Sequence, residues 1–197
     1  MRLALAGGVL LLAGAALAQD SVPPVEDAFV RLFSDYCLQK FPDDGALAAQ
    51  AGKDKLEALS PAQVQAIENK PGGMGWMVTR DGVPYLLTVE DTSLHSCVLR
   101  RTSDMVLDGA PVIAAAKSYV EASGHKLLPP AAFSRPMAGG MISNSLTLQE
   151  LDGKDVPLPR AFMYFVVSHP PAMRPDGSVA KAFYEIRFMR QMFRQQT

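Results

Sequence analysis

Apolar residues recur at helical spacing in the first part of the chain that follows the N-terminus. Over residues 24–41 the members of one apolar stripe lie three or four positions apart: Val25, Phe29, Leu32, Phe33, Tyr36 and Cys37. An alanine-rich helical pattern continues over residues 43–59. Ser60-Pro61-Ala62-Gln63 then supplies a serine cap, a proline in the first turn and the glutamine of a capping box. The pattern predicts a helical N-terminal part over residues 24–70.

The pattern changes to strand-like segments at Gly75. Residues 75–80 and 83–90 flank Asp81-Gly82, a dipeptide typical of a two-residue hairpin turn. A third strand is expected over residues 94–101. Together these segments predict a first β-meander over residues 75–101.

A second helix followed by strands comes next. Residues 110–123 carry a helical apolar stripe that Gly124 ends, and the prolines of residues 129–136 indicate a loop. Strands are expected over three further segments: residues 141–150, 159–168 and 182–190. The apolar run 162–167 would lie on both faces of its strand, which is typical of a central strand covered on both sides.

These elements predict a single α+β domain over residues 19–197. The helices and strands alternate as helix-βββ-helix-βββ, ending with a second β-region over residues 141–190. The simplest assembly is one largely antiparallel sheet of about five to seven strands, with the helices on one face. The order of the strands in that sheet is left open.

The first residues have the three parts of a secretory signal peptide. Arg2 gives a positive start, an apolar run follows from Leu3, and Ala16-Leu17-Ala18 is a small-residue cleavage site. We therefore expect residues 1–18 to be removed and a mature protein in the periplasm or the medium. The apolar run contains three glycines and is shorter than the roughly 20 residues that a membrane anchor needs, so we expect no membrane span after cleavage.

Charge excludes one class of partner. The full chain has 19 basic and 20 acidic residues and a formal net charge of −1, and loss of Arg2 with the signal peptide makes it −2. A near-neutral chain is not expected to bind nucleic acid through bulk electrostatics.

The only two cysteines, Cys37 and Cys97, lie in the exported part. An oxidising compartment favours their pairing, and each lies in an apolar segment, so we expect one structural disulfide. Closing a loop of about 60 residues would stabilise the fold by roughly 4 kcal/mol. The alternative makes Cys97 a nucleophile beside His95, with which it would share a strand face.

Histidine and methionine offer little metal chemistry. His95, His125 and His169 are scattered and lack the spacing of a zinc site, so no metal or cofactor is expected. Three methionine pairs suggest a minor alternative of Cu(I) binding: Met74 with Met77, Met137 with Met141, and Met189 with Met192. Core packing explains these methionines more simply.

No strong catalytic motif is present. Gly72-Gly73-Met74-Gly75 lacks the pattern of a phosphate loop, and Trp76 is expected to pack in the sheet. The enzyme alternative is a hydrolase whose site is assembled only in three dimensions, from Ser145, His169 and Asp176. The basic C-terminal end, with Arg187, Arg190 and Arg194, is expected to be solvated, and docking to an acidic partner or a lipid surface is the minor alternative.

Four features resemble uncharacterised exported proteins of Gram-negative bacteria. They are the signal peptide, the helix end Asp35-Tyr36-Cys37-Leu38, the pair Gly75-Trp76 and the strand pair Cys97-Val98. The resemblance covers mostly residues 25–101 and implies a periplasmic two-cysteine α+β protein, without an activity. We therefore expect a non-enzymatic exported protein that binds a protein partner or a small ligand on its sheet or helix face.

Overall fold

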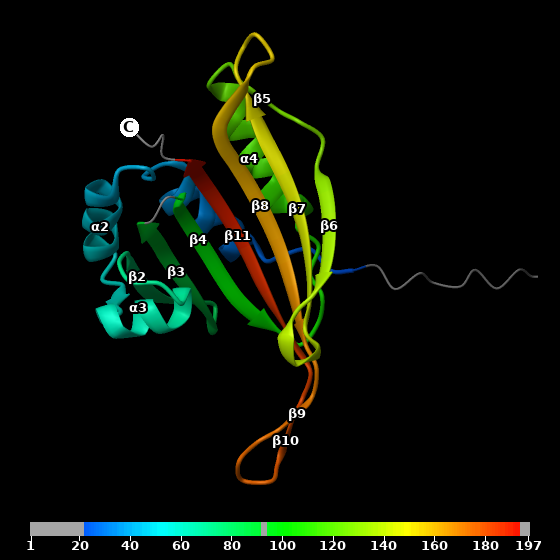
Figure 1. Cartoon of the computed structure of the whole chain (residues 1–197). Coiled ribbons are helices and arrows are strands. Elements are labelled where there is room, and N and C mark those ends of the chain that lie inside the picture. The colour runs from blue at the N-terminus through cyan, green and yellow to red at the C-terminus, as the bar shows by residue number, and fades with distance from the viewer. Residues whose placement is uncertain (1–21, 92–93, 194–197) are drawn as a thin grey trace, which may run out of the picture.

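The computed structural model describes residues 22–91 and 94–193, which form a mixed α+β fold around one large antiparallel sheet (Figure 1). The signal peptide predicted over residues 1–18 lies outside the described residues. The sheet has nine strands in the order β1-β2-β3-β4-β11-β8-β7-β5, and β6 also pairs with β7. These strands are β1 (Glu57–Ala58), β2 (Met74–Arg80), β3 (Val83–Asp91), β4 (Leu94–Ser103), β5 (Lys126–Leu127), β6 (Ala131–Pro136), β7 (Ile142–Leu151), β8 (Pro157–His169) and β11 (Phe183–Phe193).

A two-stranded ribbon protrudes from one end of the sheet. It consists of β9 (Ala172–Met173) and β10 (Val179–Ala180) and joins β8 to β11 (Figure 1). The helical elements are α1 (Asp27–Leu32), the π-helix η1 (Phe33–Leu38), α2 (Asp44–Lys53), α3 (Pro61–Glu68), α4 (Ala110–Ala122) and the short 3-10 helix η2 (Ala138–Gly140).

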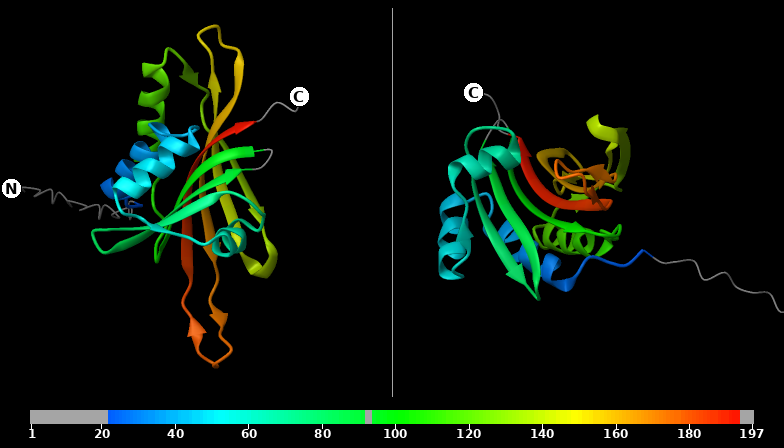
Figure 2. Two further views of the ribbon diagram at one scale, coloured as in Figure 1. Left: turned by 90° about the vertical axis from the view of Figure 1, so that its left-hand side faces the viewer. Right: turned by 90° about the horizontal axis from the view of Figure 1, so that it is seen from below.

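The main core lies between the sheet and the helices α1, η1 and α4, around which the sheet bends (Figure 2). Leu87, Leu99, Phe162 and Phe188 project from neighbouring strands into this core and are fully buried. Burial of such side chains provides the main driving force for folding. The face of the sheet that carries these residues is called the core face below.

The predicted disulfide is confirmed. Cys37 in η1 and Cys97 in β4 are bonded, and their Cα atoms are 5.5 Å apart, which is within the range that a bridge can span. Both cysteines are fully buried in the core. The bond therefore attaches the first helical segment to the core face of the sheet.

Two local sequence signals, a capping box and a hairpin turn, define element ends at the positions predicted from the sequence. Ser60 accepts a hydrogen bond from the Gln63 backbone N–H, and the Gln63 side chain accepts one from the Ser60 backbone, which completes the capping box of α3. Asp81 and Gly82 both have positive φ in the turn between β2 and β3, as a two-residue hairpin requires. The mixed α+β class and the antiparallel sheet are also confirmed.

The second group of strands is arranged differently from a simple repeat. β11, the last strand of the chain, lies between β4 and β8 and pairs with both along most of its length. The chain therefore closes its sheet by inserting its C-terminal strand beside the first meander. The sheet also exceeds the expected five to seven strands, because β1 and β5 add two-residue edges and β6 adds a longer one.

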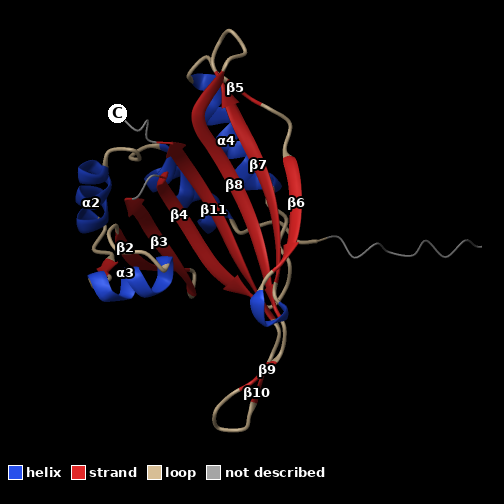
Figure 3. Ribbon diagram, viewed as in Figure 1, coloured by secondary structure: helices blue, strands red, loops and turns tan. Residues whose placement is uncertain are grey.

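The segment expected to be a loop over residues 129–136 contains strand β6 (Figure 3). β6 pairs with β7 along residues 131–136, and all six of its residues are exposed. Proline is tolerated on an edge strand, where one side of the backbone needs no ladder partner. Pro136 is therefore compatible with strand β6 and forms its last residue.

The helices do not all cover the same face. Along β4, Cys97 and Leu99 face the core, so Arg100 points to the other face. Its guanidinium binds Glu68 of α3 at 2.5 Å. α3 therefore packs on the face opposite η1, in contrast to the expected single helical layer.

Candidate functional site: an apolar groove

An open groove of about 640 Å³ lies on the core face, beyond the N-terminal end of α4. One side is formed by β6, β7 and β8, and the other by Val22 and the segment 106–109. The lining residues are Val22, Val106, Leu107, Asp108, Gly109, Ala132, Phe133, Ser134, Asn144, Ser145, Leu146, Tyr164 and Val166. In Figure 1 α4 lies behind β7 and β8, and none of the lining residues belongs to α1, η1 or α4.

Backbone hydrogen bonds hold the wall formed by residues 106–109 in place. The Asp108 N–H donates to the Pro23 carbonyl at 2.8 Å, and the Asp108 carbonyl accepts from the Val25 N–H at 3.0 Å. The side chain of Asp108 accepts a further bond from the Ala110 N–H at the start of α4. This wall is therefore a fixed part of the fold, and its main polar groups already have partners.

Tyr164 contributes an apolar ring to the groove. Its hydroxyl donates to the Leu107 carbonyl at 2.6 Å, and burial raises the pKa of this hydroxyl above its ordinary value. The only polar atom of the side chain is thus satisfied within the protein. A bound molecule meets the ring and not an unpaired hydroxyl.

Gly109 permits the close approach of this wall to the sheet. A Cβ atom at position 109 would lie 2.8 Å from two ring carbons of Tyr164, which is shorter than real Cβ contacts allow. The absence of a side chain therefore lets the start of α4 pack on the Tyr164 ring. Any larger residue must displace the ring or the wall.

The polar side chains of the groove lie mainly on its β6–β7 side. Ser134 and Asn144 are directly opposite each other in the pairing of β6 with β7, and both are exposed. Directly opposite residues of an antiparallel pair project to the same face. The groove thus combines an apolar body with one polar margin.

The residues of the hydrolase alternative are not brought together. Ser145 lines the groove and is paired with Phe165, whereas His169 lies four residues further along β8, at a distance of about 13 Å along the strand. The His169 ring stacks on Phe183, and Asp176 accepts hydrogen bonds from Ser178 in the turn of the protruding ribbon. These positions do not form a nucleophile, a base and an orienting group.

Cys97 has no free thiol for nucleophilic chemistry, because it is bonded to Cys37. Its neighbour His95 is 2.8 Å from Asp44, and its ring packs beside Phe41. The contact with Asp44 connects the start of β4 to the start of α2. Both contacts account for His95 as a structural residue.

The other metal candidates also have structural surroundings. Met74 packs against the core while Met77 lies on the opposite face, and Met189 and Met192 are likewise separated by the alternation of their strand. Met137 and Met141 flank η2 and share a backbone hydrogen bond. In the part of the chain that the structure describes, no cluster of three or more His, Cys, Asp or Glu residues could hold a metal ion.

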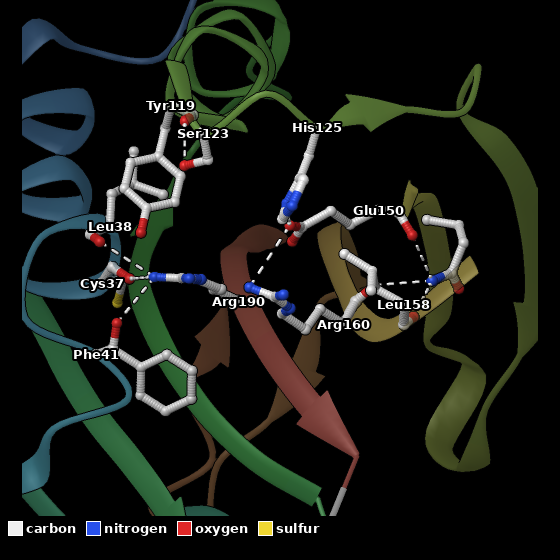
Figure 4. A network of polar contacts seen from close by, with 11 residues as sticks. Cys37, Leu38, Phe41, Tyr119, Ser123, His125, Glu150, Leu158, Arg160 and Arg190 are labelled. Atoms are coloured by element: carbon white, nitrogen blue, oxygen red, sulfur yellow. Dashed lines mark hydrogen bonds and ion pairs between the residues drawn. The ribbon is translucent and has the colours of Figure 1, made fainter. Parts of the chain in front are cut away.

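The prediction of a solvated basic C-terminal end is wrong for Arg190. This residue is 4 % exposed, and its guanidinium donates to the carbonyls of Cys37, Leu38 and Phe41 at 2.8–3.2 Å (Figure 4). The reason is that β11 is a central strand and Arg190 lies on its core face, directly opposite Cys97 of β4. Arg187 instead binds Glu185, and Arg194 lies outside the described residues.

A second polar network lies beside Arg190. The ring of His125 is 2.7 Å from the buried carboxylate of Glu150, and Arg160 lies 3.6 Å from the same oxygen (Figure 4). The amide of Gln149 donates to the carbonyls of Leu158 and Arg160. This network joins β7 and β8 near their connection and lies away from the groove lining.

A pair of partly buried carboxyl groups lies on the face beneath α3. Glu68 binds Arg100, and Glu90 accepts a hydrogen bond from Ser96. Burial, followed by the hydrogen bond and charge of Glu68, raises the pKa of Glu90 from 4.5 to about 7. The pKa of Glu68 is lowered by its hydrogen bond to Glu90 and by Arg100, despite its own burial.

The sequence reasoning missed the groove. Its walls come from segments that are far apart along the chain, namely 22, 106–109 and 132–146. Phe133 is no signal for it: this aromatic residue is 63 % exposed, but it alternates with Ala132 and so projects to the face opposite the groove. Trp76, in contrast, is 7 % exposed and packs in the core, as predicted.

Comparison of the chain with protein-family models, with curated proteins and with solved structures finds no match. No helix in the described ranges 22–91 and 94–193 is long and apolar enough to cross a membrane. The fold defined above is an antiparallel sheet that bends around helices and carries an apolar groove at one side.

Proposed function

We propose that the chain is an exported binding protein whose groove holds a small apolar molecule with one polar end. The observation that supports this proposal most directly is the groove itself, whose volume of about 640 Å³ falls within the common range for small-molecule sites. The proposal keeps the expected non-enzymatic role and selects the small ligand over the protein partner. An acyl chain is the simplest molecule of this class.

Exposed apolar side chains provide the affinity in this account. Val22 and Val106 line the groove and are 52 % and 38 % exposed. A ligand that covers them removes apolar surface from water on both partners. Each buried CH₂ group of the ligand contributes about 0.8 kcal/mol, so the affinity should rise with the length of the acyl chain.

The polar margin sets the orientation of the ligand. Ser134 and Asn144 can hydrogen-bond a hydroxyl, an ester or a carboxyl group, while the ring of Tyr164 and the side chain of Leu146 contact the apolar part. Asp108, the one charged lining residue, already accepts a backbone hydrogen bond. A strongly charged ligand is therefore not expected in the body of the groove.

The experiment is a fluorescence titration of the mature protein with N-phenyl-1-naphthylamine, a neutral apolar probe. Ala132 lines the groove, so Ala132→Trp should fill part of it and weaken binding by at least about tenfold. Ala131→Trp is the matched control, because Ala131 is the preceding exposed residue of β6 and projects to the other face.

Circular dichroism should confirm that both variants remain folded. The proposal requires wild type and Ala131→Trp to bind the probe with similar affinity. Equal binding by all three proteins would place the probe elsewhere, and no binding by any of them would remove the proposed function.

A further inference from the structure

The end of the sheet from which the β9–β10 ribbon protrudes carries a cluster of exposed apolar side chains. Met173 and Val179 on the ribbon are 79 % and 64 % exposed, and Phe183, Met105 and Ile142 are 37–48 % exposed. Strand pairing places them at one end, since Tyr184 pairs with Ser103, and Ile142 with Ser168. This group of five residues is called the apolar end.

The ribbon presents its apolar residues in a fixed arrangement. Met173 and Val179 are directly opposite each other, so their side chains share one face of the ribbon. The turn between them is held by hydrogen bonds from the Ser178 backbone and hydroxyl to Asp176, and by the Arg174 N–H bond to the Ser178 carbonyl. The ribbon extends beyond η2 and the rest of the sheet (Figure 2).

A basic cleft of about 760 Å³ lies between the ribbon and the end of β4. Its charged lining residues are Arg101, Arg174 and Lys181 against the single acid Asp104. Arg101 pairs with Glu26, whereas no ion pair joins Arg174 or Lys181 to a carboxylate in the described ranges. The two ribbon cations are therefore available to an anionic group beside the exposed apolar side chains.

An anionic lipid surface matches both properties at once. Apolar side chains that insert among acyl chains and cations that contact phosphate headgroups are the two components of interfacial membrane binding. A folded protein partner would need a complementary acidic and apolar surface, whereas a bilayer offers this combination wherever it is anionic.

The groove lies next to this end. Its lining residues Asn144 and Leu146 are two and four residues from Ile142, about 7 and 13 Å along β7. Val166 is three residues from the end of β8, where the ribbon connection begins. A protein that rests on its apolar end would hold the groove within a short distance of the lipid headgroups.

We infer that the β9–β10 ribbon and the apolar end dock on anionic lipid bilayers, and that the groove exchanges its ligand there. The docking step stands on the ribbon and the basic cleft alone, and the exchange step rests on the proposed function. The ligand in this account is a lipid-derived molecule with an acyl chain.

The test is flotation of the mature protein with vesicles of equal parts phosphatidylglycerol and phosphatidylcholine, compared with phosphatidylcholine alone. Wild type should float with the anionic vesicles. Met173→Asp with Val179→Asp should lose flotation. Arg174→Glu with Lys181→Glu should reduce it by more than about tenfold, because each cation near an anionic surface is worth roughly a fivefold change.

Val156→Asp is the matched control, since Val156 is 53 % exposed in the turn between β7 and β8 at the opposite end of the sheet. This variant should float like wild type. Equal flotation of wild type and both ribbon variants would overturn the inference. It would also be overturned if Val156→Asp lost flotation to the same extent as the ribbon variants. Failure of wild type to float would also overturn it.

Probe binding separates the two proposals. The ribbon variants should bind N-phenyl-1-naphthylamine as wild type does, and Ala132→Trp should still float with anionic vesicles. Normal probe binding without flotation removes only the docking step. Normal flotation without probe binding removes only the groove function.

Discussion

The two halves of the sheet differ in how completely they are covered. The β2–β3–β4 half is enclosed by the disulfide-bonded η1 on the core face and by α3 on the other, and Leu87, Val89 and Leu99 are fully buried there. The β6–β7 edge bounds the groove, in which Val22 and Val106 remain in contact with solvent. The first half supplies stability, and the second retains an open apolar surface that a ligand can cover.

Loss of the disulfide should produce the largest effect on stability. Replacing Cys37 and Cys97 together with alanine should lower the free energy of unfolding by about 2–5 kcal/mol. Urea denaturation measures the total change. Hydrogen exchange should show faster opening of α1 and η1 than of β7 and β8, and equal acceleration in both halves would contradict the proposed difference between them.

Replacement of Arg190 should have the next largest effect. Arg190→Met leaves three buried carbonyls of η1 and its following turn without their donor, which should cost about 2–4 kcal/mol. Arg187→Met provides the comparison, because Arg187 is partly exposed and pairs with Glu185, so its loss should cost about 1 kcal/mol or less. Denaturation midpoints that fall equally in the two variants would show that the carbonyl contacts are not the cause.

Gly109→Ala should cost less but should act on the groove. The new Cβ meets the Tyr164 ring at 2.8 Å, so the ring or the wall must shift, at about 1–3 kcal/mol. Binding of the apolar probe should weaken at the same time. Gly52→Ala is the control, since that glycine lies in α2 with no atom near an added Cβ, and this change should be neutral or slightly stabilising.

The smallest expected effect is a pH dependence of the free energy of unfolding, which arises from Glu90 beneath α3. The pKa of Glu90 is raised to about 7 in the folded protein, so the folded state binds its proton more tightly than the unfolded state does. The free energy of unfolding should therefore fall as the pH rises from about 5 to 8. Lowering of the pKa of Glu68 acts in the opposite direction and only at more acidic pH.

Glu90→Gln should flatten this slope, and Glu57→Gln, which changes an exposed residue of β1, should leave it in place. Thermal denaturation at several pH values measures both. A slope that survives in Glu90→Gln would assign the pH dependence to another group.

Local signals in the sequence predicted several element ends correctly, because they act between neighbouring residues. The helical pattern expected over residues 43–59 was wrong beyond Lys53, where α2 ends and the short strand β1 follows. The capping box at Ser60 and the turn at Asp81-Gly82 depend on contacts within four positions and were found at the expected places. The disulfide was predicted from the expected export to an oxidising compartment and from the presence of only two cysteines, and the structure contains it.

Long-range pairing could not be predicted in the same way. The insertion of β11 between β4 and β8 depends on contacts between residues about 90 positions apart, such as Arg190 with Cys97, and no local pattern specifies them. The burial of Arg190 and the groove both follow from this arrangement. β6 was missed because prolines near a segment ordinarily indicate a loop, and an edge strand is the exception.

Hydrogen exchange of the protein without residues 1–18, with and without saturating N-phenyl-1-naphthylamine, tests the central claim most directly, because it compares the two halves in one measurement. The account predicts that added protection is confined to β6, the first half of β7 and residues 106–110 around the groove. Exchange in β2 and β3 should not change. Protection that appears in β2, β3 or α3 while β6 and β7 remain unaffected would contradict the assignment of the groove as the ligand site.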